Sequence, residues 1–312
     1  MKEKVTYSAL KMFKNCQRKY KNRYIREIVA MGYDDEKLFL GSLIHNCLEI
    51  WYKTNSRKKV LEIIPPENLL ARAMIVSYIK KYATEPFEVV AVEKEFSVDI
   101  INPETNRQSK SFTLAGKVDA IVKMENGQYY ILEHKTASSI NNTYLDALWT
   151  DFQIIIYSLF LGVKITGVVY NIIGKAKLKQ AEGETEEEYQ ERRSKLMAKN
   201  KSFRTSAKRK MPESDQAYFK RLLKKYKEDN MFHREEIIIS KPLLEDLKFE
   251  LWDLTQALLD AKNKDRYYKN GDFCFNYNSA CQYYELCKSC DNEIVLENLY
   301  EHKPAHEELE GK

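Results

Sequence analysis

The stretch from Gly116 to Ala137 constrains the fold of this chain more than any other part of the sequence. It contains two apolar runs, rich in β-branched residues, on either side of the Asn-Gly step at residues 126–127. Such a step between alternating apolar runs is among the strongest short-range signals for a β-hairpin. We therefore expect two adjacent antiparallel strands joined by a tight turn.

Charged residues interrupt both apolar runs, and the pairing register decides whether they meet. If the loop consists of residues 125–127, with Gly127 left-handed in a bulge, Asp119 lies directly opposite Glu133 and Lys135 shares their face of the sheet. A two-residue turn would instead send Glu133 to the other face, because a slip of one residue inverts every side chain. We expect the three-residue loop.

Two carboxylates that converge at a strand pair can bind a hard divalent cation such as Mg²⁺ through oxygen ligands. A neighbouring ammonium group can position the attacking water and stabilise the negative charge that develops on a phosphate. Asp119, Glu133 and Lys135 together supply these groups. The hairpin therefore indicates metal-assisted hydrolysis of a phosphodiester bond.

This pattern resembles the PD-(D/E)XK nuclease superfamily and, within it, the RecB-like exonuclease branch, whose iron-sulfur-containing members are related to CRISPR-adaptation and AddB-type nucleases. Asp119 stands in the first acidic motif, with Val118 in place of the usual proline, and residues 133–135 match the E-x-K motif. The resemblance implies a DNA nuclease of phage or mobile-element type that uses Mg²⁺ or Mn²⁺. Asp119 and Glu133 would bind the metal, with the backbone carbonyl of His134 as a further candidate, and Lys135 would orient the water.

Two further motifs of the same family fall on expected helices. Residues 41–45 resemble its G-x-x-x-H motif, which implies that His45 is another metal ligand, whereas a single histidine on an apolar helix is otherwise a core residue. On a helix expected over residues 145–161, Gln153 and Tyr157 are four residues apart and project from one face. They resemble the Q-x-x-x-Y motif, implied to steady the active site and to contact the nucleic-acid backbone.

The other elements complete an α/β pattern. We expect a first helix with Ser8 as its N-cap, a buried helix beginning near Gly41, a strand before the hairpin and another after the helix at 145–161. This order matches a restriction-endonuclease-like core, a mixed sheet flanked by helices, with helical N- and C-terminal additions. We expect a single nuclease domain over residues 1–312, with a helical N-terminal part (1–85), a catalytic core (86–175), a charged insertion (176–230) and a C-terminal strand, helix and cysteine cluster (231–312).

The composition is that of a globular chain with a mildly basic charge balance. Of its 312 residues 44% are hydrophobic, and 51 Lys and Arg face 46 Asp and Glu, a balance that permits a nucleic-acid partner. No run of about 18 apolar residues and no secretory signal is present, so we expect a cytoplasmic protein without a membrane partner.

The charged insertion is dense in Lys, Arg and Glu and poor in aliphatic residues. A run of this kind is usually a solvated helical arm or a mobile loop. The functional alternative is a basic flap over a nucleic-acid channel, with Phe203 available for base stacking.

Four of the six cysteines fall within residues 274–290, which in a reducing compartment indicates a metal site. One interpretation is a local Zn²⁺ site made by these four, which are Cys274, Cys281, Cys287 and Cys290. The other is a [4Fe-4S] cluster held by Cys16, Cys281, Cys287 and Cys290, as implied by the resemblance to nucleases that take one cysteine from the first helix. The spacing of the last three departs from that family's pattern, and Cys274 is in excess.

Together these observations predict a metal-dependent DNA exonuclease of recombination, repair or phage DNA metabolism, acting on single- or double-stranded ends. Because no Walker motif is present, a helicase or recombination partner would have to separate the strands. The alternative is a catalytically silent nucleic-acid-binding protein with a structural metal-cysteine staple.

Overall fold

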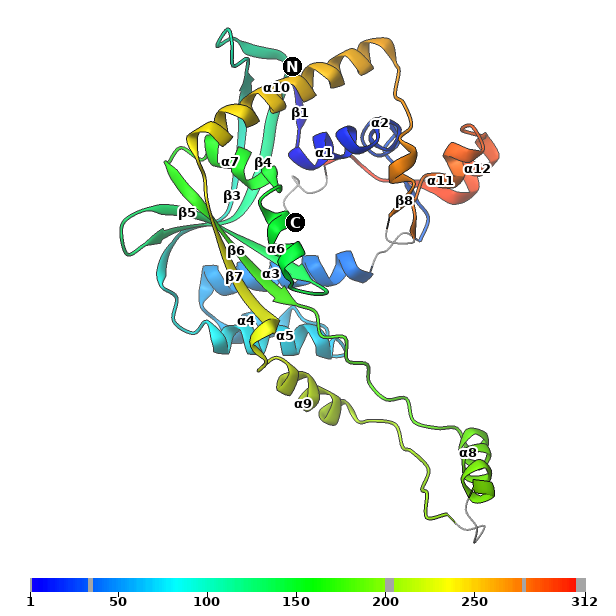
Figure 1. Ribbon diagram of the computed structural model, residues 1–312. Coiled ribbons are helices and arrows are strands. Elements are labelled where there is room, and N and C mark those ends of the chain that lie inside the picture. Colours follow the sequence, from blue (N-terminus) through cyan, green and yellow to red (C-terminus); the bar gives the residue numbers. More distant parts are fainter. Residues whose placement is uncertain (1, 33–35, 200–204, 277–278, 307–312) are drawn as a thin grey trace.

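A mixed β-sheet forms the centre of the computed structural model, which describes residues 2–32, 36–199, 205–276 and 279–306 (Figure 1). In the described part of the chain this main sheet has six strands, and two smaller sheets have two strands each. The strands are β1 (Glu3–Val5), β2 (Ile28–Ala30), β3 (Phe87–Ile101), β4 (Gln108–Met124), β5 (Tyr129–Ala137), β6 (Ile165–Gly174), β7 (Phe232–Ile238), β8 (Phe275–Asn276), β9 (Ser279–Ala280) and β10 (Tyr300–His302).

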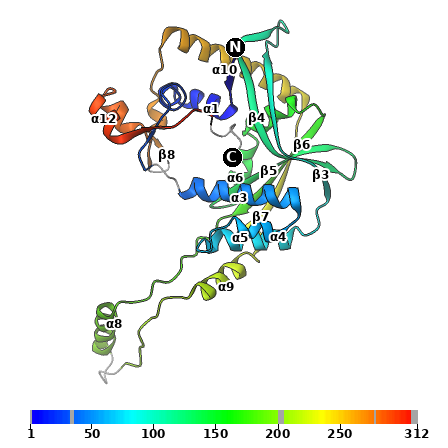
Figure 2. The same ribbon diagram turned by 180° about the vertical axis from the view of Figure 1, so that it is seen from behind.

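Helices cover both faces of the main sheet (Figures 1 and 2). One apolar core joins the sheet to α1, α7 and α10, and a second core joins α3, α4, α5 and α9. No helix in the described ranges combines the length and the apolar character needed to span a lipid bilayer. The helices are α1 (Tyr7–Asn15), α2 (Gln17–Tyr20), η1 (Lys21–Ile25), α3 (Glu36–Thr54), α4 (Arg57–Glu62), α5 (Leu69–Lys81), α6 (Asn142–Leu148), α7 (Phe152–Tyr157), η2 (Ser158–Phe160), α8 (Glu186–Lys199), α9 (Asp215–Lys225), η3 (Asp229–Met231), α10 (Lys241–Lys264), η4 (Gly271–Phe273), α11 (Tyr284–Lys288) and α12 (Glu293–Leu299).

Strand β4 organises the sheet because its two edges are used differently. Antiparallel β3 follows one edge along nearly its whole length. On the other edge, β5 pairs with residues 120–123 and β1 pairs with residues 112–114, so residues 115–119 lie between the two ladders. Beyond β5 the sheet continues with parallel β6 and antiparallel β7. The expected mixed sheet flanked by helices is therefore confirmed, and the gap along β4 falls at the first acidic motif.

Three expected helix boundaries are wrong. Helix α3 begins at Glu36, five residues before the start expected near Gly41. Helix α1 begins one residue before Ser8 and is capped by Thr6, whose side chain accepts a hydrogen bond from the Ala9 N–H at 3.2 Å. The earlier start buries the side chain of Tyr7 in the core. The helix expected over 145–161 is broken into α6, α7 and η2, and Asp151 immediately precedes α7.

The charged insertion leaves the sheet as a long arm, defined from here on as residues 175–214. Its outgoing and returning limbs run side by side, with the Glu184 N–H bonded to the Lys210 carbonyl at 2.9 Å and the Glu213 N–H to the Ala181 carbonyl at 2.8 Å. Helix α8 lies at the far end, and α9 returns the chain to the body, where it packs beside α5 (Figures 1 and 2). The arm projects away from the sheet and does not cover it, and Phe203 lies outside the described residues.

Candidate active site

The hairpin adopts the three-residue loop that the sequence predicts. Gly127 has a φ of 81°, which favours glycine, and its N–H donates to the Met124 carbonyl at 2.8 Å. In the ladder that follows, Ala120 pairs with Leu132, and this register continues to place Asp119 opposite Glu133. The turn therefore brings the two carboxylates to one level of the sheet.

Asp119 lies in the gap along β4, just past the end of the β4–β5 ladder. Its Oδ2 accepts a hydrogen bond from the backbone N–H of His134 at 2.7 Å. The Asp119 carboxylate therefore replaces the backbone acceptor that β4 would otherwise provide for this N–H. On its other edge β5 continues to pair with β6. The carboxylate of the first motif is thus positioned by the second motif.

His45 reaches the same gap from α3. The apolar side chains of Leu43, Ile44, Cys47 and Leu48 are buried and hold this helix on the sheet. The His45 Nδ1 lies 3.3 Å from Oδ1 of Asp119. The structure therefore brings His45 together with the hairpin, as the G-x-x-x-H resemblance implies.

Glu133 and Lys135 lie on the same face of β5, and Asp151 meets them from the break before α7. The Lys135 Nζ is 2.9 Å from Oε1 of Glu133 and 3.2 Å from Oδ2 of Asp151. The ring of Tyr170 lies beneath this ammonium group, 5.8 Å from its centroid. Lys135 is therefore fixed between two carboxylates. Only the helix break places Asp151 here, and no feature of the sequence indicates that break.

The charges of the site are strongly coupled. Burial, followed by repulsion from Asp119, raises the pKa of Glu133 to about 7. Burial alone would lower the pKa of His45, but the facing Asp119 outweighs it and raises that pKa to about 9. Burial opposes ionisation of Asp119 too, yet His45 and the His134 N–H lower its pKa. The Lys135 pKa is raised, since Glu133 and Asp151 outweigh the effect of burial.

The donor set has the chemistry of a site for a hard divalent cation. Within the described ranges, no three His, Cys, Asp or Glu side chains are grouped so that they could hold a metal ion. At this site the donors bond to neighbouring side chains instead. However, Oδ1 of Asp151 is buried with no hydrogen-bond partner in the described structure, and Glu133 is partly protonated near neutral pH. A cation would give the Asp151 oxygen a partner and would stabilise the ionised form of Glu133. Carboxylate oxygens are the ligands that Mg²⁺ and Mn²⁺ prefer. The residues present therefore fit such an ion.

The imidazole of His134 forms contacts away from the carboxylates, with Asn171 and Tyr52. Its Nδ1 accepts a hydrogen bond from the Asn171 side chain at 2.9 Å, and Tyr52 stacks on the ring with centroids 5.5 Å apart. Burial lowers its pKa to about 3, so the ring is neutral. The metal role expected of His134 can therefore fall only to its backbone carbonyl.

Tyr157 lies in the core. Its ring packs edge-on against Phe96 at 4.8 Å, and both rings close over Gly116, where an added Cβ would come within 2.6 Å of the Tyr157 ring. Gln153, one turn earlier on α7, is half-buried. The structure thus places Tyr157 against the strand of the first acidic motif, while the contact of Gln153 with nucleic acid stays a prediction.

Glu93 is a second acidic residue that the sequence did not single out. The β3–β4 pairing places it opposite Asp119, on the other edge of β4, and its backbone has a φ of 54°. A left-handed residue inside a strand costs of order 1–3 kcal/mol and is often found near functional sites. Its carboxylate pairs with Lys117, and burial is the main reason that its pKa is raised.

A small cavity of about 30 Å³ collects four of the six cysteines between the first helices and the C-terminal segment. Those that line it are Cys16, Cys274, Cys281 and Cys287. Burial, with a contribution from the neighbouring thiols, raises the pKa values of Cys281 and Cys287. Three of the four cysteines expected to hold a cluster thus lie together, whereas Cys290 is exposed and does not line the cavity.

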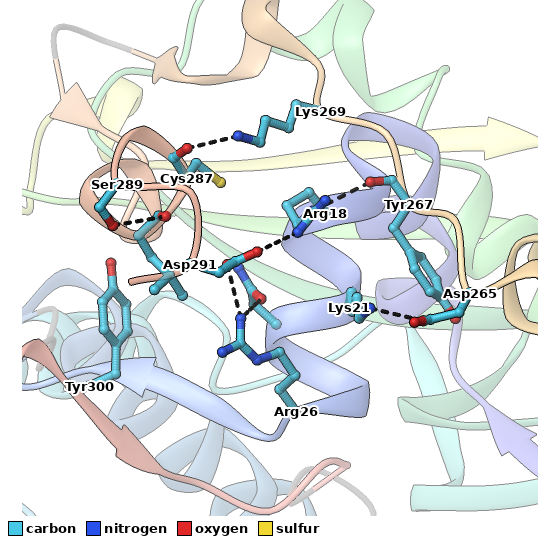
Figure 3. A network of polar contacts seen from close by, with 12 residues as sticks. Arg18, Lys21, Arg26, Asp265, Tyr267, Lys269, Cys287, Ser289, Asp291 and Tyr300 are labelled. Carbon is cyan, nitrogen blue, oxygen red and sulfur yellow. Dashed lines mark hydrogen bonds and ion pairs between the residues drawn. The ribbon is translucent and has the colours of Figure 1, made fainter. Parts of the chain in front are cut away.

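The chain next to Cys290 explains its position. Cys290 and Asp291 both have left-handed backbones, with φ of 55° and 62°. This bend presents Asp291 to two arginines of the N-terminal segment, with distances of 2.6 Å to Arg18 and 3.0 Å to Arg26 (Figure 3). The two ends of the described chain also pair as β2 and β10. These contacts join the ends, and no three cysteines of the described residues are arranged to hold a metal as they stand.

Comparison with known proteins gives a family and likenesses to solved structures. A model described as the PD-(D/E)XK nuclease superfamily matches residues 4–291 of the chain. No curated protein matches it. Among solved structures, the crystal structure of SSO0001 is similar with 14% identity and a TM-score of 0.24, over 59% of this chain and 71% of that one. At this TM-score the likeness carries no argument about fold or function.

Proposed function

The chain belongs to the PD-(D/E)XK nuclease superfamily, and on that premise we propose that it is a metal-dependent DNA exonuclease of the RecB-like branch. One observation supports the proposal most strongly. Asp119, Glu133 and Lys135, which match the superfamily's acidic and E-x-K motifs, meet with His45 at the gap along β4. Nucleases of this superfamily generally use Mg²⁺ or Mn²⁺.

Each of these residues has a role that follows from its surroundings. Asp119, Glu133 and His45 would hold the metal, with the His134 carbonyl as a further ligand. When bound, the metal supplies a Lewis acid that polarises the phosphodiester and activates water. His45 must lose its proton to serve, since only neutral imidazole ligates a metal.

Lys135 acts as a donor and a fixed positive charge, not as a base. Its pKa is raised, so it keeps its proton throughout the physiological range. Glu133 and Asp151 hold its Nζ in one place. From there it orients the attacking water and stabilises the charge that develops on the phosphate. Asp151 is thus a positioning residue for Lys135 through Oδ2, and its buried Oδ1 is a further candidate oxygen for the ion.

The α7 residues support this site from behind. Tyr157 packs on Gly116, three residues before Asp119, and so fixes the course of β4 at the gap. Gln153, on the same helix, would contact the nucleic-acid backbone. Both roles follow the Q-x-x-x-Y resemblance.

The decisive experiment is digestion of end-labelled linear and covalently closed circular DNA, single- and double-stranded, with Mg²⁺ or Mn²⁺. We expect loss of linear DNA alone and a fall of at least about 100-fold in Lys135→Ala, the usual cost of removing one donor to the developing charge. Lys94→Ala is the matched control, because Lys94 is an exposed lysine of the neighbouring strand β3. Cleavage of circles would make the enzyme an endonuclease.

A second outcome would favour the binding-protein alternative. If folded protein with Mn²⁺ bound cuts none of these substrates, the chain is a nucleic-acid-binding protein that kept the fold. Glu133→Ala further distinguishes the exonuclease hypothesis from the binding-protein hypothesis. In an exonuclease it should abolish cleavage and leave DNA binding largely intact. Mn²⁺-induced stabilisation, measured by thermal melting, should also be lost in Glu133→Ala, and this readout does not depend on activity.

We also propose that the cysteine cavity holds a metal centre, a [4Fe-4S] cluster or, alternatively, Zn²⁺. Its role would be structural, because it would close one long loop between the first helices and the C-terminal segment. The cavity lining supports Cys16, Cys281 and Cys287 as ligands and favours Cys274 over Cys290 as the fourth. Elemental analysis of protein prepared without oxygen tests this. Cys16→Ser should lose metal and melt at a lower temperature, whereas Cys290→Ser should retain both properties.

The biological setting follows from the resemblance alone. An exonuclease of this branch would act in recombination, repair or phage DNA metabolism, with a helicase or recombination partner to separate strands.

A further inference from the structure

We propose that the arm is a second DNA contact, which binds the phosphate backbone of duplex DNA on its way to the active site; this inference rests on the proposed nuclease function. The arm would set how strongly long substrates bind, while the chemistry stays at the hairpin. Charge, accessibility and position in the fold each support it.

The arm carries the whole net charge of the chain. Its 40 residues include 12 Lys and Arg against seven Asp and Glu, while the chain has 51 against 46. The rest of the molecule is therefore balanced, and the net charge of +5 belongs to the arm. A clustered positive charge of this kind attracts polyanions and speeds their association.

Ion pairs within the arm involve three of its seven carboxylates, Glu184, Glu186 and Glu191, and leave more cations than carboxylates without such a partner among the described residues. Glu184 accepts two hydrogen bonds from Arg192, at 2.5 and 2.8 Å, and Glu191 pairs with Lys195 at 2.5 Å. Six exposed cations of the described arm form no ion pair with a described carboxylate, namely Lys177, Lys179, Arg193, Lys199, Lys208 and Lys210. Because they lie on both limbs and on α8, they are free to contact phosphates along the length of the arm.

The described part of the arm, residues 175–199 and 205–214, offers little stacking surface for single strands. Binding of single strands uses aromatic rings on which bases stack. Within the described arm the only aromatic residue is Tyr189, which is half-buried, and its hydroxyl donates to the Ala207 carbonyl at 3.0 Å. The described part of the arm therefore presents cations without exposed rings, which suits the backbone of a duplex.

The base of the arm lies beside the catalytic hairpin. Gly174, the last residue of β6, pairs with Ala137, and the Lys175 N–H donates to the Ala137 carbonyl at 2.7 Å. Lys135 is two residues earlier on β5. The arm therefore starts next to the site and leads away from it (Figure 1). An extended limb of 11 residues spans up to about 36–40 Å, which corresponds to roughly 11 base pairs at 3.4 Å each.

The test compares two variants that lose the same charge. The arm variant replaces Lys177, Lys179, Lys208 and Lys210 by Gln, and the body variant replaces Lys11, Lys58, Lys59 and Lys110, which are also exposed. Affinity for a 30-base-pair duplex is measured against salt concentration in protein that also carries Glu133→Ala. If all four lysines contact phosphates, the salt slope of the arm variant falls by about 3.6, at roughly 0.9 per contact. The body variant should keep the wild-type slope.

Substrate length gives the second readout. We expect the ratio of kcat/KM for a 30-base-pair duplex to that for a six-base-pair duplex to fall in the arm variant and not in the body variant. Equal slopes in the two variants, or an equal loss of single-strand binding by the arm variant, would overturn the proposal. The binding measurement needs no cleavage. Absence of activity in the wild-type protein would therefore refute the proposed function and leave the inference about the arm to its own test.

Discussion

Binding of Mn²⁺ to the metal-free protein should release protons, and their number can be calculated from the site. The Asp119 carboxylate holds the His45 pKa near 9, so the imidazole is charged at pH 7 to 8. A histidine that ligates a metal must be neutral. His45 should therefore give up about one proton when the ion binds.

Glu133 adds a share that depends on pH. Burial and Asp119 raise its pKa to about 7, so more of it is protonated at pH 7 than at pH 8. Because the bound ion requires a carboxylate, the total release should lie between about one and two protons at pH 7 and approach one at pH 8. Release should thus decrease as the pH rises across this range.

Titration calorimetry in buffers with different ionisation enthalpies measures this release directly. His45→Gln should lower it by about one proton, whereas His233→Gln, on β7 and paired with Glu235, should leave it unchanged. If wild-type protein releases no proton at pH 8, or if His45→Gln behaves as wild type does, His45 is not a ligand. The assignment of its role would then be wrong.

Three further predictions concern stability. Gly116→Ala places a Cβ within 2.6 Å of an aromatic ring and should cost about 1–3 kcal/mol in urea unfolding, while Gly271→Ala, which meets no atom within 4 Å, should cost far less. Arg234→Met leaves Glu85, whose side chain is 14% exposed, without the two bonds it accepts from Arg234 at 2.6 and 2.8 Å and should cost up to about 3–5 kcal/mol, the range for a fully buried pair; adding Glu85→Met should recover part of this, and simple addition of the two costs would contradict the argument. Since the His45 pKa is raised from 6.5 to about 9, its stabilising effect is complete below pH 6.5 and is lost as pH rises through 9, so the melting temperature of metal-free protein should decrease over that range, less so in His45→Gln.

Local chemistry explains which parts of the site the sequence could predict. The Asn-Gly step and the strand alternation fix the loop, and the loop fixes that Asp119 faces Glu133. The mixed sheet flanked by helices followed in the same way from the order of apolar runs. The roles of these residues, and the division of the chain into four parts, stay predictions.

What the sequence could not predict depends on tertiary contacts. Asp151 reaches Lys135 only because the helix over 145–161 breaks, and its apolar periodicity runs through the break. Cysteine spacing likewise cannot show that the backbone turns left-handed at Cys290 and leaves Cys274 at the cavity. The composition of the arm also does not predict that it projects away from the sheet, because a flap over the sheet could have the same composition.

The contacts between the N-terminal segment and the C-terminal segment can form only late in translation. Arg26 and Asp291 are 265 positions apart, and at 5–20 residues per second a ribosome needs about 13–53 s to make the chain between them. The hairpin of the active site emerges well before this. Throughout that interval the N-terminal segment lacks its partner strand and the aspartate that binds its arginines. The two segments can therefore join only after the hairpin has emerged, and a translation arrest before residue 280 would leave a protein with a complete hairpin and without these contacts.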